Sequence, residues 1–107
     1  MAIVPAEVFR ALGDPTRLEL VRRLSSGAPH TISSVSQGLV ISRQGARKHL
    51  QILADAHLVT LESHGRDTNV HLDRNTLEQG KAFIAELEQQ WDARLEALRQ
   101  FVDEPPR

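Results

Sequence analysis

Cationic and amide side chains are concentrated in one stretch of the chain, residues 42–59. They are Arg43, Gln44, Arg47, Lys48 and Gln51. Lysine and arginine neutralise phosphate groups, and arginine and glutamine can form paired hydrogen bonds with guanine and adenine edges in the major groove of duplex DNA. A polar helix face with three cations is more often only a solvated surface, so the neighbouring elements must decide between DNA contact and plain solvation.

The same stretch carries a strong helix signal. Ser42 is a good N-cap, because its hydroxyl can accept a hydrogen bond from a free amide of the first turn. Apolar residues then follow at helical spacing, at Ala46, Leu50, Leu53 and Ala54. This stripe predicts a buried side, and the cationic and amide residues fall roughly opposite it on the helical wheel.

The length and composition of the chain limit the classes of protein to which it can belong. Its 107 residues, 40% apolar and 25% charged, fit one compact domain at residues 1–107. No cysteine is present, which excludes disulfides, thiolate metal sites and cysteine redox sensing. No apolar run approaches the roughly 20 residues that cross a membrane, so we expect a cytoplasmic protein without membrane contact. The net charge of -1 conceals a basic middle and an acidic end.

Two helices are predicted before the cationic stretch. The first begins near Pro5, whose fixed φ suits a first turn, and it ends at Gly13. The second begins after Asp14, an N-cap that is followed by Pro15 at the first helical position. We expect three side chains of this second helix to lie on a solvated face. They are Arg17, Arg22 and Arg23.

A short third helix completes a helix-turn-helix. Residues 25–29 form a loop by composition, and Ser33 is the predicted N-cap of a helix that carries Val35 and Leu39. Only a few residues then separate this helix from Ser42. Two helices joined by so tight a turn have helix-turn-helix spacing, in which the first helix braces the second against the DNA groove.

After Leu58 the apolar period changes from helical to alternating, which indicates a strand. Residues 65–68 form a reverse turn, and residues 69–73 return as a second strand with Val70 on the apolar side. The resulting β-hairpin, or wing, spans about residues 59–73 and carries a cation, Arg66, at its tip. An isolated hairpin is marginal in water, so it must rest on the helices.

A long helix is predicted at about residues 76–102, with a cap at Asn75 or Thr76. Its apolar positions form a continuous stripe. They are Ile84, Leu87, Trp91, Leu95, Leu98 and Val102. The preceding core is too small to cover this stripe, so we predict that a second copy covers its far end, in an interface shared with Val4 and Val8.

Three segments of the chain match a known pattern. They are Leu-Gly-Asp-Pro-Thr-Arg at residues 12–17, Ser42 with Lys48-His49-Leu50 and Leu53, and Leu58-Val59 leading to Gly65-Arg66. With these segments the chain resembles the ArsR/SmtB (arsenic-repressor-like) family of bacterial transcription factors. The resemblance implies a mainly α winged helix-turn-helix fold, with about five helices and a small β-hairpin, that dimerises through its first and last helices.

The resemblance also implies a function. Family members are homodimers that place two recognition helices in successive major grooves of a near-palindromic operator, and most repress transcription until an effector binds. The recognition helix corresponds to residues 42–57. By position, eight residues are the predicted contacts with double-stranded DNA. They are Thr31, Ser33, Ser42, Arg43, Gln44, Arg47, Lys48 and Arg66.

The chain departs from the family's pattern at several positions. Residues 32–39 lack the paired cysteines of many metal-sensing members, and no histidine follows His71, although other members place metal ligands on the last helix. We therefore expect no metal site and no cofactor. Val40 replaces a glycine often found in the turn. His57 stands where a glycine usually closes the recognition helix, so a positive φ there would carry a cost.

The same residues bear on two other functional classes, and they leave the regulatory signal open. An enzyme is disfavoured, because the acids of the last helix have no nucleophile nearby and imply no pocket. A winged-helix protein-interaction module is the alternative, and an exposed apolar patch on the outward face of residues 42–51 would favour it. The signal remains open between a small organic effector, a partner protein and no effector.

Overall fold

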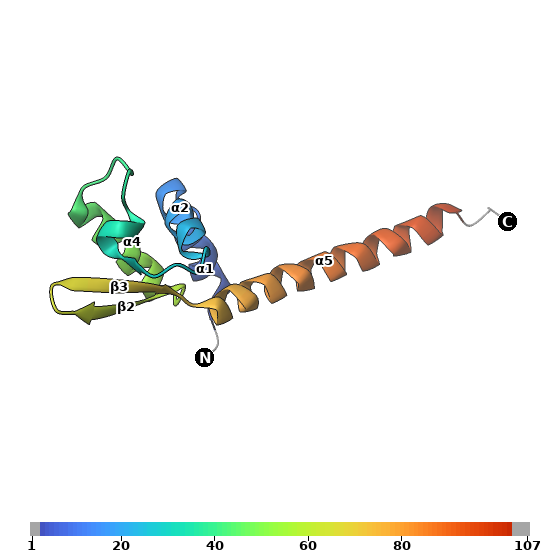
Figure 1. Ribbon diagram of the computed structural model, residues 1–107. Coiled ribbons are helices and arrows are strands. Elements are labelled where there is room, and N and C mark those ends of the chain that lie inside the picture. The colour runs from blue at the N-terminus through green and yellow to red at the C-terminus, as the bar shows by residue number, and fades with distance from the viewer. Residues whose placement is uncertain (1–2, 104–107) are drawn as a thin grey trace.

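Five helices and a three-stranded antiparallel sheet make up the computed structural model, which describes residues 3–103 (Figure 1). The helices are α1 (Pro5–Leu12), α2 (Pro15–Leu24), α3 (Ile32–Val35), α4 (Arg43–Asp55) and α5 (Arg74–Asp103). The strands are β1 (His30–Thr31), β2 (Val59–His64) and β3 (Asp67–Leu72). These elements confirm the predicted fold class, mainly α with a small β-hairpin.

Local sequence signals set the starts of α1 and α2. Pro5 occupies the first position of α1, where its missing N–H is not needed. The Asp14 carboxylate caps α2, because it accepts hydrogen bonds from the backbone N–H groups of Thr16 (2.9 Å) and Arg17 (3.1 Å). Both helices begin where the sequence predicts.

The third helix differs from its prediction. Its N-cap is Thr31 rather than Ser33, and it ends at Val35, so Leu39 lies in the following turn. The Thr31 hydroxyl accepts from the backbone N–H of Ser34 at 3.1 Å, and the Ser34 hydroxyl accepts from the backbone N–H of Thr31 at 2.8 Å. This reciprocal capping box satisfies two amides at once and fixes the start of the helix at Thr31.

The sheet has the strand order β1-β3-β2, so β1 adds an edge strand to the wing. In the wing itself, His64 pairs with Asp67, and the loop contains only Gly65 and Arg66. The predicted four-residue turn at residues 65–68 is therefore wrong. A two-residue hairpin turn requires positive φ at its centre, and Gly65 supplies it with a φ of 65°.

The core lies where the helices meet one another and the sheet. Its largest fully buried side chains come from α1, α2, α3, α4 and the wing. They are Val8, Leu20, Val35, Leu50, Leu53, Leu58, Val59 and Val70. Val8, which the sequence assigned to the dimer interface, is 1% exposed. It belongs to the core of its own chain and offers a partner almost no surface, because α1 turns this side chain inward.

The last helix begins two residues earlier than predicted, at Arg74. Asp73 follows β3 directly, and its carboxylate accepts from the backbone N–H of Thr76 at 3.3 Å. Thr76 lies inside the helix and is 2% exposed, so neither Asn75 nor Thr76 is the cap. An acidic cap placed at the end of the strand explains the early start.

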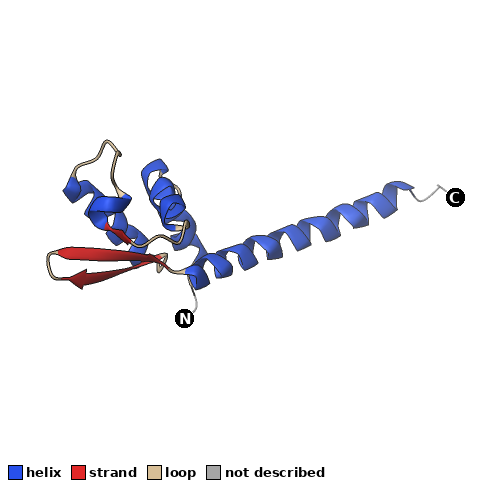
Figure 2. Cartoon of the chain, viewed as in Figure 1, coloured by secondary structure: helices blue, strands red, loops and turns tan. Residues whose placement is uncertain are grey.

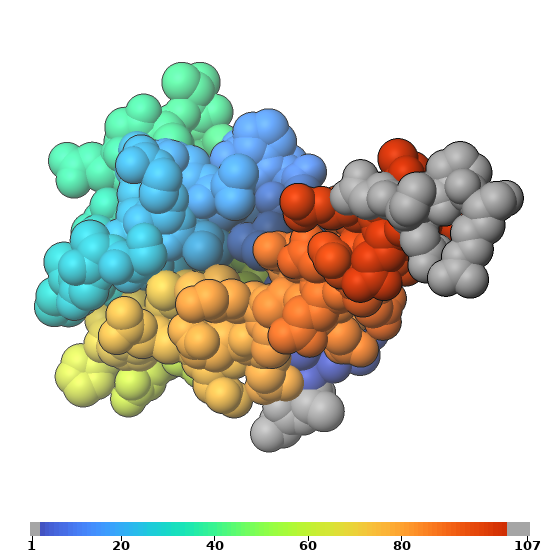
Figure 3. All heavy atoms as spheres, turned by 90° about the vertical axis from the view of Figure 1, so that its right-hand side faces the viewer, coloured from blue at the N-terminus to red at the C-terminus, as the bar shows by residue number. Residues whose placement is uncertain are grey.

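Most of α5 projects from the body of the molecule (Figures 1 and 2). Its first turns contact the N-terminal segment: the rings of Phe9 and Phe83 lie 5.9 Å apart between centroids, and the Ile3 backbone N–H donates to Gln79 Oε1 at 3.1 Å. The rest extends away and gives the molecule dimensions of 76 × 30 × 22 Å. Figure 3 shows this distal part, coloured orange to red, standing in front of the body.

Candidate nucleic-acid interface

The helix α4 starts and packs as its sequence predicts. The Ser42 hydroxyl accepts from the backbone N–H of Gly45 at 2.9 Å. Glycine suits this position because a Cβ there would lie 3.1 Å from Ser42 Oγ. Ala46, Leu50 and Leu53 are each 0% exposed, so one side of α4 is fixed in the core.

The other side of α4 is a continuous polar surface, which we call the outer face. Its side chains are all exposed. They are Arg43, Gln44, Arg47, Lys48 and Gln51. Gln51 Nε2 donates to Asp55 Oδ1 one turn further along, at 2.9 Å. Three cations and an exposed amide on a single helix face match the phosphates and base edges that line a DNA major groove.

An arginine of α2 ties α4 to the N-terminal helices. Arg17 Nε donates to the backbone oxygen of Ala11 at 2.7 Å, and Arg17 Nη1 lies 3.3 Å from His49 Nδ1 on the inner side of α4. The Asp14 carboxylate lies 3.9 Å from the same nitrogen. The predicted solvated position of Arg17 is wrong, because its guanidinium reaches the last carbonyls of α1.

The same contacts change the acidity of Asp14. The hydrogen bond from the backbone N–H of Arg17 is the largest cause, and the charges of Arg17 and His49 act in the same direction. Together they hold the pKa of Asp14 below its ordinary value of 3.8. The carboxylate is therefore stabilised in its charged, capping form.

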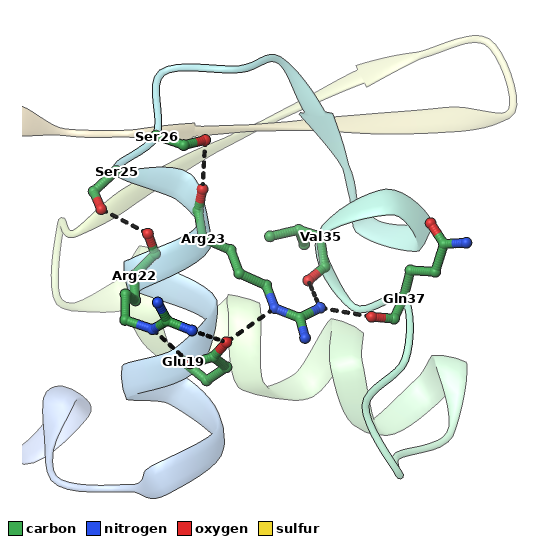
Figure 4. A network of polar contacts seen from close by, with 7 residues as sticks. All are labelled: Glu19, Arg22, Arg23, Ser25, Ser26, Val35 and Gln37. Atoms are coloured by element: carbon green, nitrogen blue, oxygen red, sulfur yellow. Dashed lines mark hydrogen bonds and ion pairs between the residues drawn. The ribbon is translucent and has the colours of Figure 1, made fainter.

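A second arginine of α2 braces the turn before α4 (Figure 4). Arg23 Nη1 donates to the backbone oxygens of Val35 at 3.1 Å and Gln37 at 2.6 Å. Arg23 Nε donates to Glu19 Oε1 at 3.2 Å. We call this arrangement the turn clamp. It corrects the prediction of a solvated Arg23, because the guanidinium spans the gap between α2 and the end of α3.

Glu19 holds two arginines of its own helix. Arg22 donates to both of its carboxylate oxygens at 2.8 Å, and the Arg22 side chain stays exposed, as the sequence predicts. The hydrogen bonds from Arg22 and then Arg23 hold the pKa of Glu19 below its ordinary 4.5. In return, the hydrogen bond with Glu19 raises the pKa of Arg22.

Residues 36–42 connect α3 to α4 and form a longer turn than the few residues predicted, because α3 ends early. Gly38 adopts a positive φ of 84°, which stops the helix from continuing. Leu39 and Ile41 are half-buried against the core, whereas Val40 between them is fully exposed.

At the C-terminal end of α4, His57 adopts a positive φ of 64°, the conformation for which the sequence implies a backbone cost. The backbone N–H of His57 donates to the oxygen of Ala54, and that of Leu58 donates to the oxygen of Leu53, both at 2.9 Å. This Schellman arrangement closes the helix and directs the chain into the wing.

The outer face of α4 and the tip of the wing lie at the same end of the molecule. In Figure 1 the N-terminal end of α4 and the hairpin tip both point away from distal α5. Arg66 is exposed at that tip, and Ser33 is exposed at the start of α3. Thr31 and Ser42 differ from the other predicted contacts, because their hydroxyls already accept capping bonds from the backbone N–H groups of Ser34 and Gly45.

Comparisons with known proteins find helix-turn-helix transcriptional regulators. A family profile described as a helix-turn-helix domain matches residues 12–62. The HTH-type transcriptional regulator Rv2034 of Mycobacterium tuberculosis is 30% identical over 99 residues, which cover 92% of this chain and 89% of that protein. The structure of an ArsR-like transcriptional regulator from Rhodococcus sp. RHA1 is 32% identical, covers 94% of each chain and gives a TM-score of 0.80. The chain belongs to the ArsR family of transcriptional regulators.

A further solved ArsR-family regulator, RHA00566, is 28% identical, covers 86% of this chain and 97% of its own, and gives a TM-score of 0.76. The present ArsR-family protein is accordingly a DNA-binding transcriptional regulator and not an enzyme. In its winged helix-turn-helix fold, α4 follows the turn after α3, and β2 with β3 forms the wing.

Two findings concern other kinds of site in this ArsR-family regulator. Within residues 3–103, no group of three or more histidine, aspartate or glutamate side chains is placed to hold a metal ion. None of the helices over the same residues is long and apolar enough to cross a membrane. His49 is used in the contact with Arg17, and His71 Nε2 lies 3.6 Å from Glu62 on the wing.

Sequence reasoning missed the structural roles of Arg17 and Arg23. The i, i+4 spacing of Glu19 and Arg23 is a signal for a local ion pair on α2. The bonds from Arg23 to Val35 and Gln37 depend instead on how α3 packs against α2, and no periodicity in the sequence reports that packing.

Proposed function

We propose that this ArsR-family regulator is a homodimeric repressor that binds a near-palindromic operator. The observation that carries the proposal is the exposed outer face of α4, with Arg43, Arg47 and Lys48, at the same end of the molecule as Arg66. A helix fits the major groove, while cations beside it neutralise phosphates on both strands.

The predicted contacts divide into two roles under this proposal. Arg47 and Gln44 read base edges, because arginine and glutamine can form paired hydrogen bonds to guanine and adenine. The remaining contacts position the protein on the sugar-phosphate backbone, with Arg66 at the backbone or the flanking minor groove. They are Thr31, Ser33, Ser42, Arg43, Lys48 and Arg66.

A second copy of the chain is the proposed partner of α5. The exposed fractions of Leu87, Trp91, Leu95 and Leu98 range from 46% to 61%, which is unusual for a continuous apolar stripe. A groove of about 330 Å³ between α1 and α5 adjoins the stripe and includes Ile84. A fold relative from Mycobacterium bovis, Mb0332, is described as a homodimeric winged helix-turn-helix DNA-binding domain (TM-score 0.62, 16% identical).

The signal that releases DNA is proposed to act without thiol chemistry, since the chain has no cysteine. The dimer interface around α1 and α5 is the proposed place for a small organic effector. A partner protein, or regulation by protein concentration alone, would use the same DNA-binding surface.

The experiment that tests this function begins with selection of duplexes from a random pool by the wild-type protein. Fluorescence anisotropy then measures affinity for the enriched duplex and for a scrambled one. We expect sequence-selective binding that weakens steeply as salt is added, because phosphate contacts release counterions. Arg47→Ala should cost about 1 to 3 kcal/mol on the enriched duplex and much less on the scrambled one.

Arg22→Ala is the matched control, because it removes an exposed positive charge from α2, outside the outer face. It should leave the preference for the enriched duplex unchanged. An equal loss on both duplexes for Arg47→Ala would make Arg47 a phosphate contact. Failure of the pool to enrich any sequence would contradict the proposed function and favour a protein-interaction module.

A further inference from the structure

Val40 is the most exposed large apolar side chain within residues 3–103, with an exposed fraction of 102%. It lies in the turn between α3 and α4, two residues before Ser42, the N-cap of the recognition helix. A branched apolar side chain that stands fully in water at this place contributes nothing to the core of its own chain. A function for the Val40 side chain must therefore be sought in a contact with another molecule.

The backbone around Val40 is held firmly in place. The turn clamp fixes the start of the turn, since Arg23 Nη1 lies 2.6 Å from the backbone oxygen of Gln37. Leu39 donates from its backbone N–H to the oxygen of Ser36 at 3.1 Å. Because Leu39 and Ile41 both turn inward to the core, the residue between them is directed outward.

Residues of the outer face of α4 follow Val40 closely in the chain. Arg43 and Gln44 lie within the next four residues, and both are exposed. A protein partner would be expected to meet an apolar patch, but the exposed apolar stripe lies on α5, at the opposite end of the molecule. Cations beside a single apolar side chain instead match DNA, in which phosphates flank the bases.

We propose that Val40 contacts the C5-methyl group of a thymine at the edge of each operator half-site. This methyl is the one apolar group that a base pair presents in the major groove, and aliphatic side chains recognise it by contact. Val40 thereby adds a specificity-determining contact that hydrogen-bonding residues of the outer face cannot make. The inference rests on the proposed DNA-binding function.

The test uses the full-length protein and the duplex enriched by wild-type selection. Each thymine is replaced in turn by deoxyuridine, which removes only the C5-methyl group. In the wild type, replacement of the contacted thymine in one half-site should weaken binding about fourfold, the factor expected for burial of one methyl-sized group. Val40→Ala removes the contact from both half-sites, so it should bind the thymine duplex about sixteenfold more weakly and should not distinguish thymine from deoxyuridine at that position.

Leu18→Ala is the control, because Leu18 is a 54% exposed apolar residue of α2 outside the outer face. It should keep the wild-type sensitivity to deoxyuridine. Thermal unfolding should show the same midpoint for Val40→Ala and the wild type, because the Val40 side chain is fully exposed. A loss of binding by Val40→Ala then reports a lost contact rather than a damaged fold.

The outcomes separate this inference from the function on which it rests. If a duplex is enriched but no thymine position shows coupling with Val40→Ala, the thymine contact is overturned and DNA binding stands. The same conclusion follows if Val40→Ala weakens binding equally on thymine and deoxyuridine duplexes, because Val40 would then contact the backbone. If no duplex is enriched, both the function and the contact are overturned.

Discussion

Asp14 serves local and tertiary structure at the same time. Its carboxylate caps α2 through the backbone N–H groups of Thr16 and Arg17, and it lies 3.9 Å from His49 on α4. The charged form makes all of these contacts. Protonation of one side chain therefore weakens both the start of α2 and its link to α4.

The lowered pKa of Asp14 predicts a loss of stability in acid. The unfolded chain binds this proton more readily than the folded chain, so the stabilisation is complete above the ordinary pKa of 3.8 and is lost as pH falls through the lower folded pKa. Urea unfolding from pH 7 to pH 2.5 checks this, with Asp14→Asn as the variant, because asparagine caps helices without titrating.

The Asp14→Asn curve should fall less steeply with acid than the wild-type curve. Some slope should remain, because the pKa of Glu19 is also lowered, chiefly by the hydrogen bond from Arg22. Parallel curves for the variant and the wild type would show that the Asp14 contacts do not distinguish its two protonation states.

His57 carries a backbone cost that a single substitution can remove. Its φ of 64° lies in the left-handed region, which costs a residue with a Cβ about 1 to 2 kcal/mol. His57→Gly should therefore raise the thermal unfolding midpoint, and His57→Val should lower it. Gly65→Ala is the control in the opposite direction and should lower the midpoint. Gly65 has a φ of 65°, and an added Cβ would meet no neighbouring atom, so this substitution adds only backbone strain. An unchanged midpoint for His57→Gly would show that the imidazole contributes as much as the strain costs.

At the scale of the elements, the position of α4 depends on α2. The apolar side of α4 fixes the helix in the core, and Arg17 and Arg23 join α2 to the helix-turn-helix at two different places. Arg17 reaches His49 on α4 itself, whereas Arg23 acts on the turn that precedes it. The outer face is thus presented by a supported element rather than by a loop.

Removal of the turn clamp should affect both stability and DNA binding. Arg23→Gln takes away a charged donor from the backbone oxygens of Val35 and Gln37, which we expect to cost about 1.5 to 3 kcal/mol in the free energy of unfolding. Urea unfolding measures this cost, and anisotropy at a temperature where the variant is folded measures binding. Arg22→Gln is the control, since the Arg22 side chain is exposed and bonds to Glu19 within α2.

The result that would contradict the turn clamp is a variant Arg23→Gln as stable as Arg22→Gln with unchanged DNA affinity. Arg23→Lys provides a further check, because a lysine has one amine in place of the guanidinium fork and should restore only part of the loss. Full restoration of stability by lysine would show that the positive charge, and not the geometry of the guanidinium group, provides the effect of the turn clamp.

The elements with local start signals could be predicted from the sequence, and those set by tertiary contacts could not. Pro5, Asp14 and Ser42 are read within one turn of chain, so α1, α2 and α4 begin where expected. The two-residue strand β1 exists because His30 pairs with Val70 across a long interval of sequence. No local pattern announces such a strand.

The same distinction applies to the candidate site. Helical periodicity around Leu50 predicts which side of α4 is buried, and the polar residues opposite it follow directly. The turn clamp and the outward position of Val40 depend on α3 ending at Val35, whereas the sequence predicts a helix that still carries Leu39. The surface could therefore be predicted, but not the contacts that support it.

At the scale of the whole molecule, α5 is too long for the body that carries it. Its 30 residues span about 45 Å, and the contact between Phe9 and Phe83 lies near its beginning. A long helix with an exposed apolar stripe is marginal in water by itself. We therefore propose that distal α5 lies in the interface of a two-fold dimer.

A variant with Trp91→Ala and Leu95→Ala together should dissociate the proposed dimer. These side chains are 61% and 46% exposed in one chain, so their loss should leave the winged helix-turn-helix body folded. Sedimentation velocity at micromolar concentration should show a dimer for the wild type and a monomer for the variant. Gln89→Ala, on the opposite side of α5, should remain dimeric. A monomeric wild type would contradict the interface.

The most direct test of the central claim places a chemical probe on the outer face of α4. Because the chain has no cysteine, Gln44→Cys provides a unique attachment point for a photocrosslinking reagent, and Gln89→Cys on α5 provides the control. The account predicts that the probe at residue 44 crosslinks to major-groove base positions at two sites about 10 base pairs apart, the spacing of successive grooves. Absence of crosslinks from residue 44, or equal crosslinking from residue 89, would contradict α4 as the recognition helix.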